Sequence, residues 1–104
     1  MTGPAEDSGW TFLTNHAHVL ILIHQNPDRV LREIANEVGI TERAVQRIVH
    51  DLVEAKYLVR TKVGRCNHYR VNARRKLRHH IEAHCSVGDL FELAVPKKRS
   101  AKKS

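Results

Sequence analysis

Residues 31–52 read LREIANEVGITERAVQRIVHDL, and two short helical patterns meet in them at a glycine. Each pattern repeats its apolar residues at the spacing of one helix face: Leu31, Ile34, Ala35 and Val38 in the first, and Val45, Ile48, Val49 and Leu52 in the second. Gly39 favours the end of the first helix, because glycine adopts a left-handed conformation at little cost. Thr41 is a favourable N-cap for the second helix. The sequence therefore predicts two helices joined by a tight turn.

The order of small, glycine and β-branched residues in this stretch is that of a known motif. Ala35 is followed by Gly39 four residues later and by Val45 six residues after that, which resembles a helix-turn-helix. An ordinary helical hairpin is the alternative. The polar face of the second helix favours the helix-turn-helix, and it carries Glu42, Arg43, Gln46, Arg47 and His50. Arginine and glutamine side chains form hydrogen bonds with guanine and adenine edges in the major groove of DNA.

Two β-rich segments follow the second helix. Residues 57–63 and 68–71 flank the turn-like sequence Gly64-Arg65-Cys66-Asn67, so we expect a β-hairpin with these four residues at its tip. A basic hairpin directly after a helix-turn-helix resembles the wing of winged-helix proteins, and residues 52–71 are similar to the corresponding part of MarR-like regulators. The resemblance covers about residues 10–72. Lys56 stands where that family often has glycine, which makes the turn from helix to strand less favourable.

The complete fold that we expect is an α+β winged helix-turn-helix, with a three-helix core, a two-stranded wing and extra C-terminal helices. The first core helix begins after Thr14 as its N-cap and continues to about Gln25. A turn at residues 26–28 ends it, and Arg29 and Val30 are expected to form a very short strand. The expected divisions of the chain are a disordered N-terminus (1–9), a DNA-binding domain (10–72), a helical dimerisation region (73–95) and a basic disordered tail (96–104).

The dimerisation region is predicted from apolar residues beyond the completed winged helix. Asn72 is expected to cap a helix from about Ala73. A narrow apolar stripe on that helix consists of Leu77, Ile81 and either His84 or Cys85, and after an interruption at residues 86–89 the short apolar end contains Leu90, Phe91 and Leu93. MarR-like proteins are dimers, so the resemblance implies a homodimer built on this stripe. The alternative is that the stripe folds back on its own core.

The resemblance gives no clear expectation about a small-molecule effector. The chain is shorter than a typical MarR-like protein, in which long terminal helices build the dimer and the pocket for phenolic effectors. The shorter length therefore argues against an effector pocket of that kind.

The charge of the chain indicates an anionic partner. The formal net charge is +7, and the isoelectric point is about 9.9. Nine Lys or Arg and no Asp or Glu lie between Lys56 and Arg78, so the basic surface belongs to the wing and the segment that follows it. No signal peptide or membrane-spanning run is recognisable, which predicts a cytoplasmic, nucleoid-associated protein with Cys66 and Cys85 reduced.

We therefore interpret the chain as a dimeric transcription regulator that binds double-stranded DNA sequence-specifically. The helix at 41–55 is expected in the major groove, and the wing at 57–71 on the minor groove and backbone. The predicted DNA-binding residues are Thr41, Glu42, Arg43, Gln46, Arg47, His50, Lys62, Arg65, Asn67 and Arg70. Arg65 is assigned to the minor groove, and the other wing cations mainly to phosphates. Enzyme motifs are not recognisable, and the interpretation includes no catalytic residue, metal or cofactor.

Other functions remain open from the sequence alone. His80 and His84 would lie one turn apart on a helix beside Cys85, a spacing that chelates transition metals in a metal-responsive winged-helix sensor. Cys66 at the wing tip, next to Arg65, is a candidate redox switch. Winged helices also serve as protein-interaction modules or bind RNA. A protein-binding winged helix need not align Arg43, Gln46, Arg47 and Arg65 toward one groove.

Overall fold

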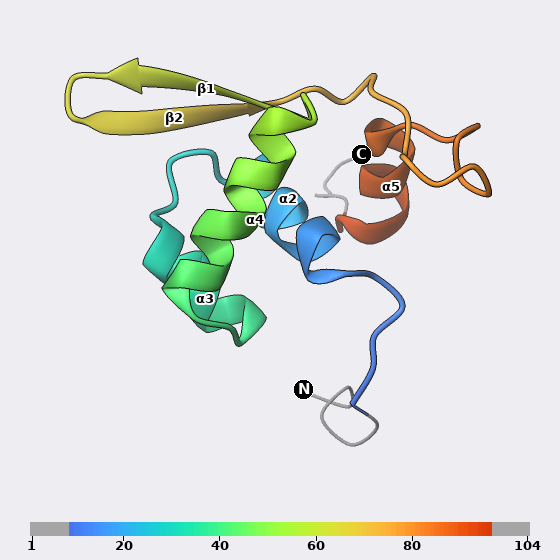
Figure 1. Ribbon diagram of the computed structural model, residues 1–104, viewed down its shortest axis with the longest axis horizontal. Coiled ribbons are helices and arrows are strands. Elements are labelled where there is room, and N and C mark those ends of the chain that lie inside the picture. The colour runs from blue at the N-terminus through green and yellow to red at the C-terminus, as the bar shows by residue number, and fades with distance from the viewer. Residues whose placement is uncertain (1–8, 97–104) are drawn as a thin grey trace, which may run out of the picture.

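The computed structural model describes residues 9–96. Its elements in chain order are α2 (Asn15–Gln25), α3 (Leu31–Val38), α4 (Glu42–Glu54), β1 (Leu58–Val63), β2 (Cys66–Val71) and α5 (Val87–Ala94) (Figure 1). Three helices followed by a two-stranded antiparallel sheet confirm the α+β winged helix-turn-helix. The expected disordered N-terminus and basic tail lie outside the described residues, apart from Gly9 and Pro96.

The predicted signals for helix starts and ends are present. Oγ1 of Thr14 accepts a hydrogen bond from the Ala17 amide, and Oγ1 of Thr41 accepts one from the Ala44 amide at 3.0 Å. Gly39 ends α3 with a φ of 90°, a left-handed conformation that favours glycine. These caps fix the boundaries of α2, α3 and α4 close to where the sequence predicts them.

The short strand expected at Arg29 and Val30 is absent. The Arg29 amide instead donates to the Asn26 carbonyl within the turn that follows α2. Val30 is extended because it is the N-cap of α3, whose first amides bond to its carbonyl. The extended backbone that the sequence suggested there belongs to a helix cap and pairs with no strand in the described chain.

The core forms where α2 meets the helix-turn-helix and the base of the wing. Every apolar position of α4 predicted to be buried is in the core, and so are Ile34 and Ala35 of α3. The largest side chains that are almost completely enclosed are Ile23, Ile34, Leu58, Val19, Val45 and Val87. Burying an aliphatic side chain of this size contributes about 1.5–3 kcal/mol. The core therefore holds α4 against the body with its polar face outward.

The wing is a regular hairpin with a shorter turn than expected. Register pairs run from Leu58 with Val71 to Val63 with Cys66, which leaves Gly64 and Arg65 as the turn. Gly64 has a φ of 62° and Arg65 has no positive φ, which is the pattern of a type II′ turn. The predicted four-residue tip is therefore wrong. The tip has two residues because glycine at the first turn position lets the strands pair up to it.

The helix expected from Ala73 is also absent. Residues 73–86 form turns, closed by an isolated bridge between Lys76 and Ser86 and by a hydrogen bond from the Leu77 amide to the Cys85 carbonyl. Asn72 caps no helix; its backbone amide donates to the Tyr57 carbonyl and its side-chain amide donates to the Lys56 carbonyl. Backbone groups of this segment form hydrogen bonds across the loop instead of along a helix. The helix predicted from the apolar spacing is therefore wrong.

The only C-terminal helix among the described residues is α5, and it begins where the sequence suggested an interruption. Oγ of Ser86 accepts from the Asp89 amide, and the Asp89 carboxylate accepts from the Ser86 amide, forming a capping box. Val87 and Phe91 of α5 are buried in the core, and the Phe91 ring stacks on His24 of α2 with centroids 4.0 Å apart. Part of the predicted dimer stripe therefore folds back on its own core.

Two apolar residues of the predicted stripe stay on the surface. Ile81 is 67% exposed and Leu93 is 81% exposed, whereas Leu77 packs against the core. In Figure 1 the hairpin projects from one side of the helical body, and α5 lies on the other side. None of the helices in residues 9–96 is long and apolar enough to cross a membrane.

Candidate nucleic-acid interface

The outward face of α4 carries the polar residues that the sequence singled out. Glu42, Arg43, Gln46, Arg47 and His50 are all exposed, on the side of the helix away from its buried stripe. Within residues 9–96, the side chains of Arg43, Gln46 and Arg47 form no hydrogen bond or ion pair. Their donors and acceptors are therefore available to a ligand.

Thr41 has a structural task at the start of this helix. Its side-chain oxygen accepts from the Ala44 amide, which fixes where α4 begins. A hollow of about 740 Å³ adjoins this end of α4 and is lined by Asn15, Ile40, Thr41, Arg43, Ala44, Gln46, Arg47 and Ile48. Asn15, the first residue of α2, is a polar member of this surface that the sequence reasoning missed. No local pattern identifies it, because it reaches the site only through the packing of α2 on α4.

The wing residues divide between two faces of the hairpin. Lys62 and Asn67 are cross-strand partners and so share a face, whereas Arg70 pairs with Val59 on the opposite face. Arg60 pairs with Tyr69 and lies on the face of Lys62, since strand residues alternate with a period of two. Arg60 was missed by the sequence reasoning, although the spacing from Lys62 was available to find it. Arg65 lies in the turn at the tip and is exposed.

Two ion pairs connect these surfaces to the body. Nε2 of His16 on α2 lies 2.8 Å from Oδ2 of Asp51 on α4. Nδ1 of His68 on β2 lies 3.1 Å from Oδ1 of Asp28 in the turn after α2. The hydrogen bond from His16 lowers the pKa of Asp51, with smaller contributions from the charges of His16, His50 and Arg47. These are exposed pairs, so each contributes little to stability but orients the side chains involved.

The cations after the wing are not equivalent. Arg74, Arg75, Lys76 and Arg78 are all exposed, but the guanidinium of Arg75 also contacts the protein. Nε of Arg75 donates to the Ala55 carbonyl at 2.8 Å, and its Cζ lies 5.5 Å from the centre of the Tyr57 ring. Arg75 is thus held at the end of α4.

The helical metal-chelating arrangement considered as an alternative for His80, His84 and Cys85 does not form. These residues lie in the turns of residues 73–86, so the spacing of one helical turn does not apply. The described part of the chain contains no group of three or more His, Cys, Asp or Glu side chains that could hold a metal ion. Cys66 is exposed on the wing and Cys85 is half-buried elsewhere, and both are free thiols.

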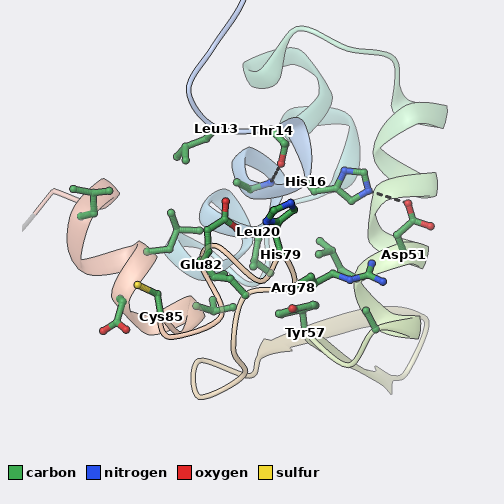
Figure 2. Close-up of a pocket in the computed structure, with 18 of the residues that line it drawn as sticks. Leu13, Thr14, His16, Leu20, Asp51, Tyr57, Arg78, His79, Glu82 and Cys85 are labelled. Atoms are coloured by element: carbon green, nitrogen blue, oxygen red, sulfur yellow. Dashed lines mark hydrogen bonds and ion pairs between the residues drawn. The ribbon is translucent and has the colours of Figure 1, made fainter.

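A second surface, which we call the apolar groove, lies away from the polar face of α4. It encloses about 710 Å³ between the start of α2, the end of α4, the loop at 77–85 and α5 (Figure 2). Its apolar lining includes Phe12, Leu13, Leu20, Leu52, Leu77, Leu90 and Leu93. In Figure 2, Arg78 extends from the loop toward α4, which carries Asp51, and Glu82 and Cys85 lie nearer α5. Phe12 is 92% exposed at the edge of this groove.

The fold and the outward face of α4 define the class of protein, a winged helix-turn-helix protein. A sequence model of the MarR family matches residues 10–65, which is more than half of the chain. The chain therefore belongs to the MarR family, whose members are DNA-binding transcription regulators and not enzymes. Neither a curated protein nor a solved structure matches the chain at a significant level. The family match ends at the wing tip, so β2 and the C-terminal segment lie beyond it.

Proposed function

We propose that this protein is a homodimeric transcription regulator that binds a specific double-stranded DNA site with α4 in the major groove. The observation that carries the proposal is that Arg43, Gln46 and Arg47 are exposed on α4, opposite its buried face, and form no hydrogen bond or ion pair within residues 9–96. Helices of this motif present their N-terminal residues to the base edges. Such a regulator acts on the chromosome in the cytoplasm.

Within this proposal, Arg43, Gln46 and Arg47 contact bases, and Glu42 and His50 flank them. Arginine pairs bidentately with guanine, and glutamine with adenine. The hydroxyl of Thr41 remains able to donate to a phosphate while it caps α4. Lys62, Asn67 and Arg70 contact the backbone from the wing, and Arg65 at the tip enters the minor groove. A narrow A·T-rich minor groove attracts arginine through its concentrated negative potential.

Binding selection from a random pool of duplex DNA tests the recognition helix. The wild type should enrich one sequence, and Gln46→Ala or Arg43→Ala should relax the preference at one position, at a cost of about 1–3 kcal/mol. Glu54→Ala, at the far end of α4, is the control and should leave the preference unchanged. Enrichment of no duplex sequence would contradict the proposal. A parallel selection from a random pool of single-stranded RNA would then distinguish RNA binding from protein interaction as the function.

The assignment of Arg65 to the minor groove has its own test. Arg65→Ala should weaken binding more at sites with A·T-rich flanks than at sites with G·C-rich flanks. Lys62→Ala should weaken both alike and lower the log–log salt slope by about 0.9, because one released counterion is lost. Equal losses for Arg65→Ala on the two flanks would make it a plain phosphate contact.

The dimer in this proposal forms through the apolar groove and a second copy of the chain. Two chains of net charge +7 repel each other, so they can associate only where positive charge is sparse. The lining of the groove has the carboxylates of Asp51, which pairs with His16, and of Glu82 and Asp89, and its only Lys or Arg is Arg78. The exposed Phe12 and Leu93 beside this lining supply apolar surface to bury. A two-fold axis through this surface would join two copies and favour a palindromic DNA site.

Sedimentation of the full chain tests the dimer. Leu93→Asp should give a monomer, since it places a carboxylate in the interface, and should fold because Leu93 is 81% exposed. Val30→Asp is the control, because Val30 is an exposed apolar residue outside the groove. The Leu93→Asp monomer should lose affinity for a palindrome but keep its affinity for a half-site. A dimer that survives Leu93→Asp would place the interface elsewhere.

A further inference from the structure

The end of α4 is held by a cluster of side-chain contacts from the segment after the wing. Nε of Arg75 donates to the carbonyl of Ala55, the C-cap of α4, at 2.8 Å. The guanidinium lies over the ring of the buried Tyr57, which directly precedes β1. The hydroxyl of Tyr57 donates in turn to the Lys76 carbonyl at 2.6 Å. One cation thus touches both the end of α4 and the beginning of the wing.

The backbone around Arg75 extends this connection to α5. Its carbonyl accepts from the Val87 amide at 2.9 Å, and Val87 is the first residue of α5. Asn72 supports the same junction, because its backbone amide donates to the Tyr57 carbonyl at 2.9 Å. The junction therefore joins α4, the wing and α5 within a few residues.

We propose that Arg75 is a positioning residue that fixes the angle between α4 and the wing, and that it does not contact phosphate. This inference rests on the proposed DNA binding, since α4 and the wing must reach one duplex at the same time. Its guanidinium donates through Nε to a helix C-terminus, where a cation is favourable, and lies over the Tyr57 ring at cation–π distance. Its neighbour Arg74 is exposed and has no hydrogen bond or ion pair within residues 9–96.

Two substitutions separate the hydrogen bond of Arg75 from its charge. In Arg75→Gln the side-chain nitrogen replaces Nε, so the variant keeps a donor to the Ala55 carbonyl and loses the charge. In Arg75→Lys the charge remains, but a methylene stands where Nε was and the guanidinium over the Tyr57 ring is lost. A positioning residue is rescued by Gln, whereas a phosphate contact is rescued by Lys. Arg75→Ala removes both properties.

The experiment measures duplex DNA affinity against salt concentration for these three variants of the full chain. Arg75→Ala and Arg75→Lys should each weaken binding roughly 3- to 10-fold, the effect of losing one hydrogen bond, with the wild-type salt slope. Arg75→Gln should bind within about twofold of the wild type. Lys62→Ala is the control, because loss of a phosphate contact should lower the log–log dependence of affinity on salt concentration. Near-normal binding by Arg75→Lys together with weak binding by Arg75→Gln would overturn the assignment, and so would normal binding by Arg75→Ala.

A measurement without DNA keeps this test independent of the proposed function. Amide hydrogen exchange in β1 and β2 should become faster in Arg75→Ala and Arg75→Lys but not in Arg75→Gln, while α2 and α3 keep their protection. Arg74→Ala is the matched neighbour and should leave exchange unchanged. If the wild type binds no DNA but exchange follows this pattern, the proposed function fails and the positioning role stands. Unchanged wing exchange in all three Arg75 variants would overturn that role.

Discussion

The two ends of α4 use their polar groups in opposite ways. At the N-terminal half, Arg43, Gln46 and Arg47 have no hydrogen bond or ion pair within residues 9–96. Near the C-terminal end, Asp51 pairs with His16, and the Ala55 carbonyl accepts from Arg75. A side chain committed inside the protein fixes geometry, and one without a partner is available to a ligand. We call the C-terminal end of α4, with Asp51 and Ala55, the anchored end, and the N-terminal half, with Arg43, Gln46 and Arg47, the presented end. The contrast indicates that contacts at the anchored end hold α4 in place while the presented end is available to a ligand.

The anchored end depends on α5, and the largest expected effect follows from that dependence. Phe91→Ala should lower the free energy of unfolding by about 3–5 kcal/mol, because Phe91 is buried in the common core and stacks on His24. Urea denaturation at low protein concentration measures it. Gln46→Ala at the presented end should stay within about 0.5 kcal/mol of the wild type. A small effect of Phe91→Ala would mean that α5 is not part of the monomer core.

A smaller change in the free energy of unfolding, of opposite sign, is expected at Lys56, in the turn between α4 and the wing. Lys56 has a φ of 71°, and its amide donates to the Val53 carbonyl while the Tyr57 amide donates to Leu52, which completes a Schellman motif. Lys56→Gly should stabilise the protein by about 1 kcal/mol, since glycine adopts this conformation without the steric cost.

The control for this prediction is the reverse type of substitution at the C-terminal end of α3. Gly39→Ala should destabilise by about 1–2 kcal/mol, because Gly39 has a φ of 90°. Thermal unfolding of both variants measures the two changes in stability, which should have opposite signs. A loss of stability in Lys56→Gly would show that the lysine side chain contributes more than its backbone costs.

The smallest effect concerns pH at the anchored end. The pKa of Asp51 lies below its ordinary value of 3.8 because His16 donates a hydrogen bond to the carboxylate. A lowered pKa means that the carboxylate stabilises the fold above that value and that this contribution disappears as the pH falls through the lowered pKa. The stability difference between the wild type and Asp51→Asn should therefore be present at neutral pH and vanish in acid. Urea titrations of both proteins at a series of pH values measure this difference, and a difference that persists unchanged in acid would contradict the prediction.

Sequence reasoning succeeded where structure is specified locally. The caps at Thr14, Thr41 and Gly39 act within a few residues of the helices they bound, and the apolar spacing of α3 and α4 matches their buried faces. The polar face of α4 was predictable for the same reason. The family resemblance predicted that Lys56 is unfavourable in its turn, and its positive φ agrees with that prediction.

The segment after the wing could not be read in this way. Its shape depends on contacts between distant residues, such as Arg75 with Ala55 and Tyr57 with Lys76. Apolar residues at i and i+4 there suggested a helix, but Leu77 packs inward while Ile81 is exposed. The hydrogen bond of Arg75 could not be predicted for a similar reason. Arg74, Arg75, Lys76 and Arg78 have similar side chains, and only the folded chain places one of them beside the Ala55 carbonyl.

The two-residue turn at Gly64 and Arg65 restricts how the wing can change length. Paired residues share a face, and side chains along each strand alternate between faces. Adding one residue to each strand would keep the turn but move the side chains between the insertion and the tip to the opposite face. Adding two residues to each strand would restore the faces and carry the tip about 7 Å further. That step is about twice the ~3.4 Å spacing of nucleotides along one DNA strand. The reach of the wing can therefore grow only in increments of about two nucleotides while the same side chains face the duplex.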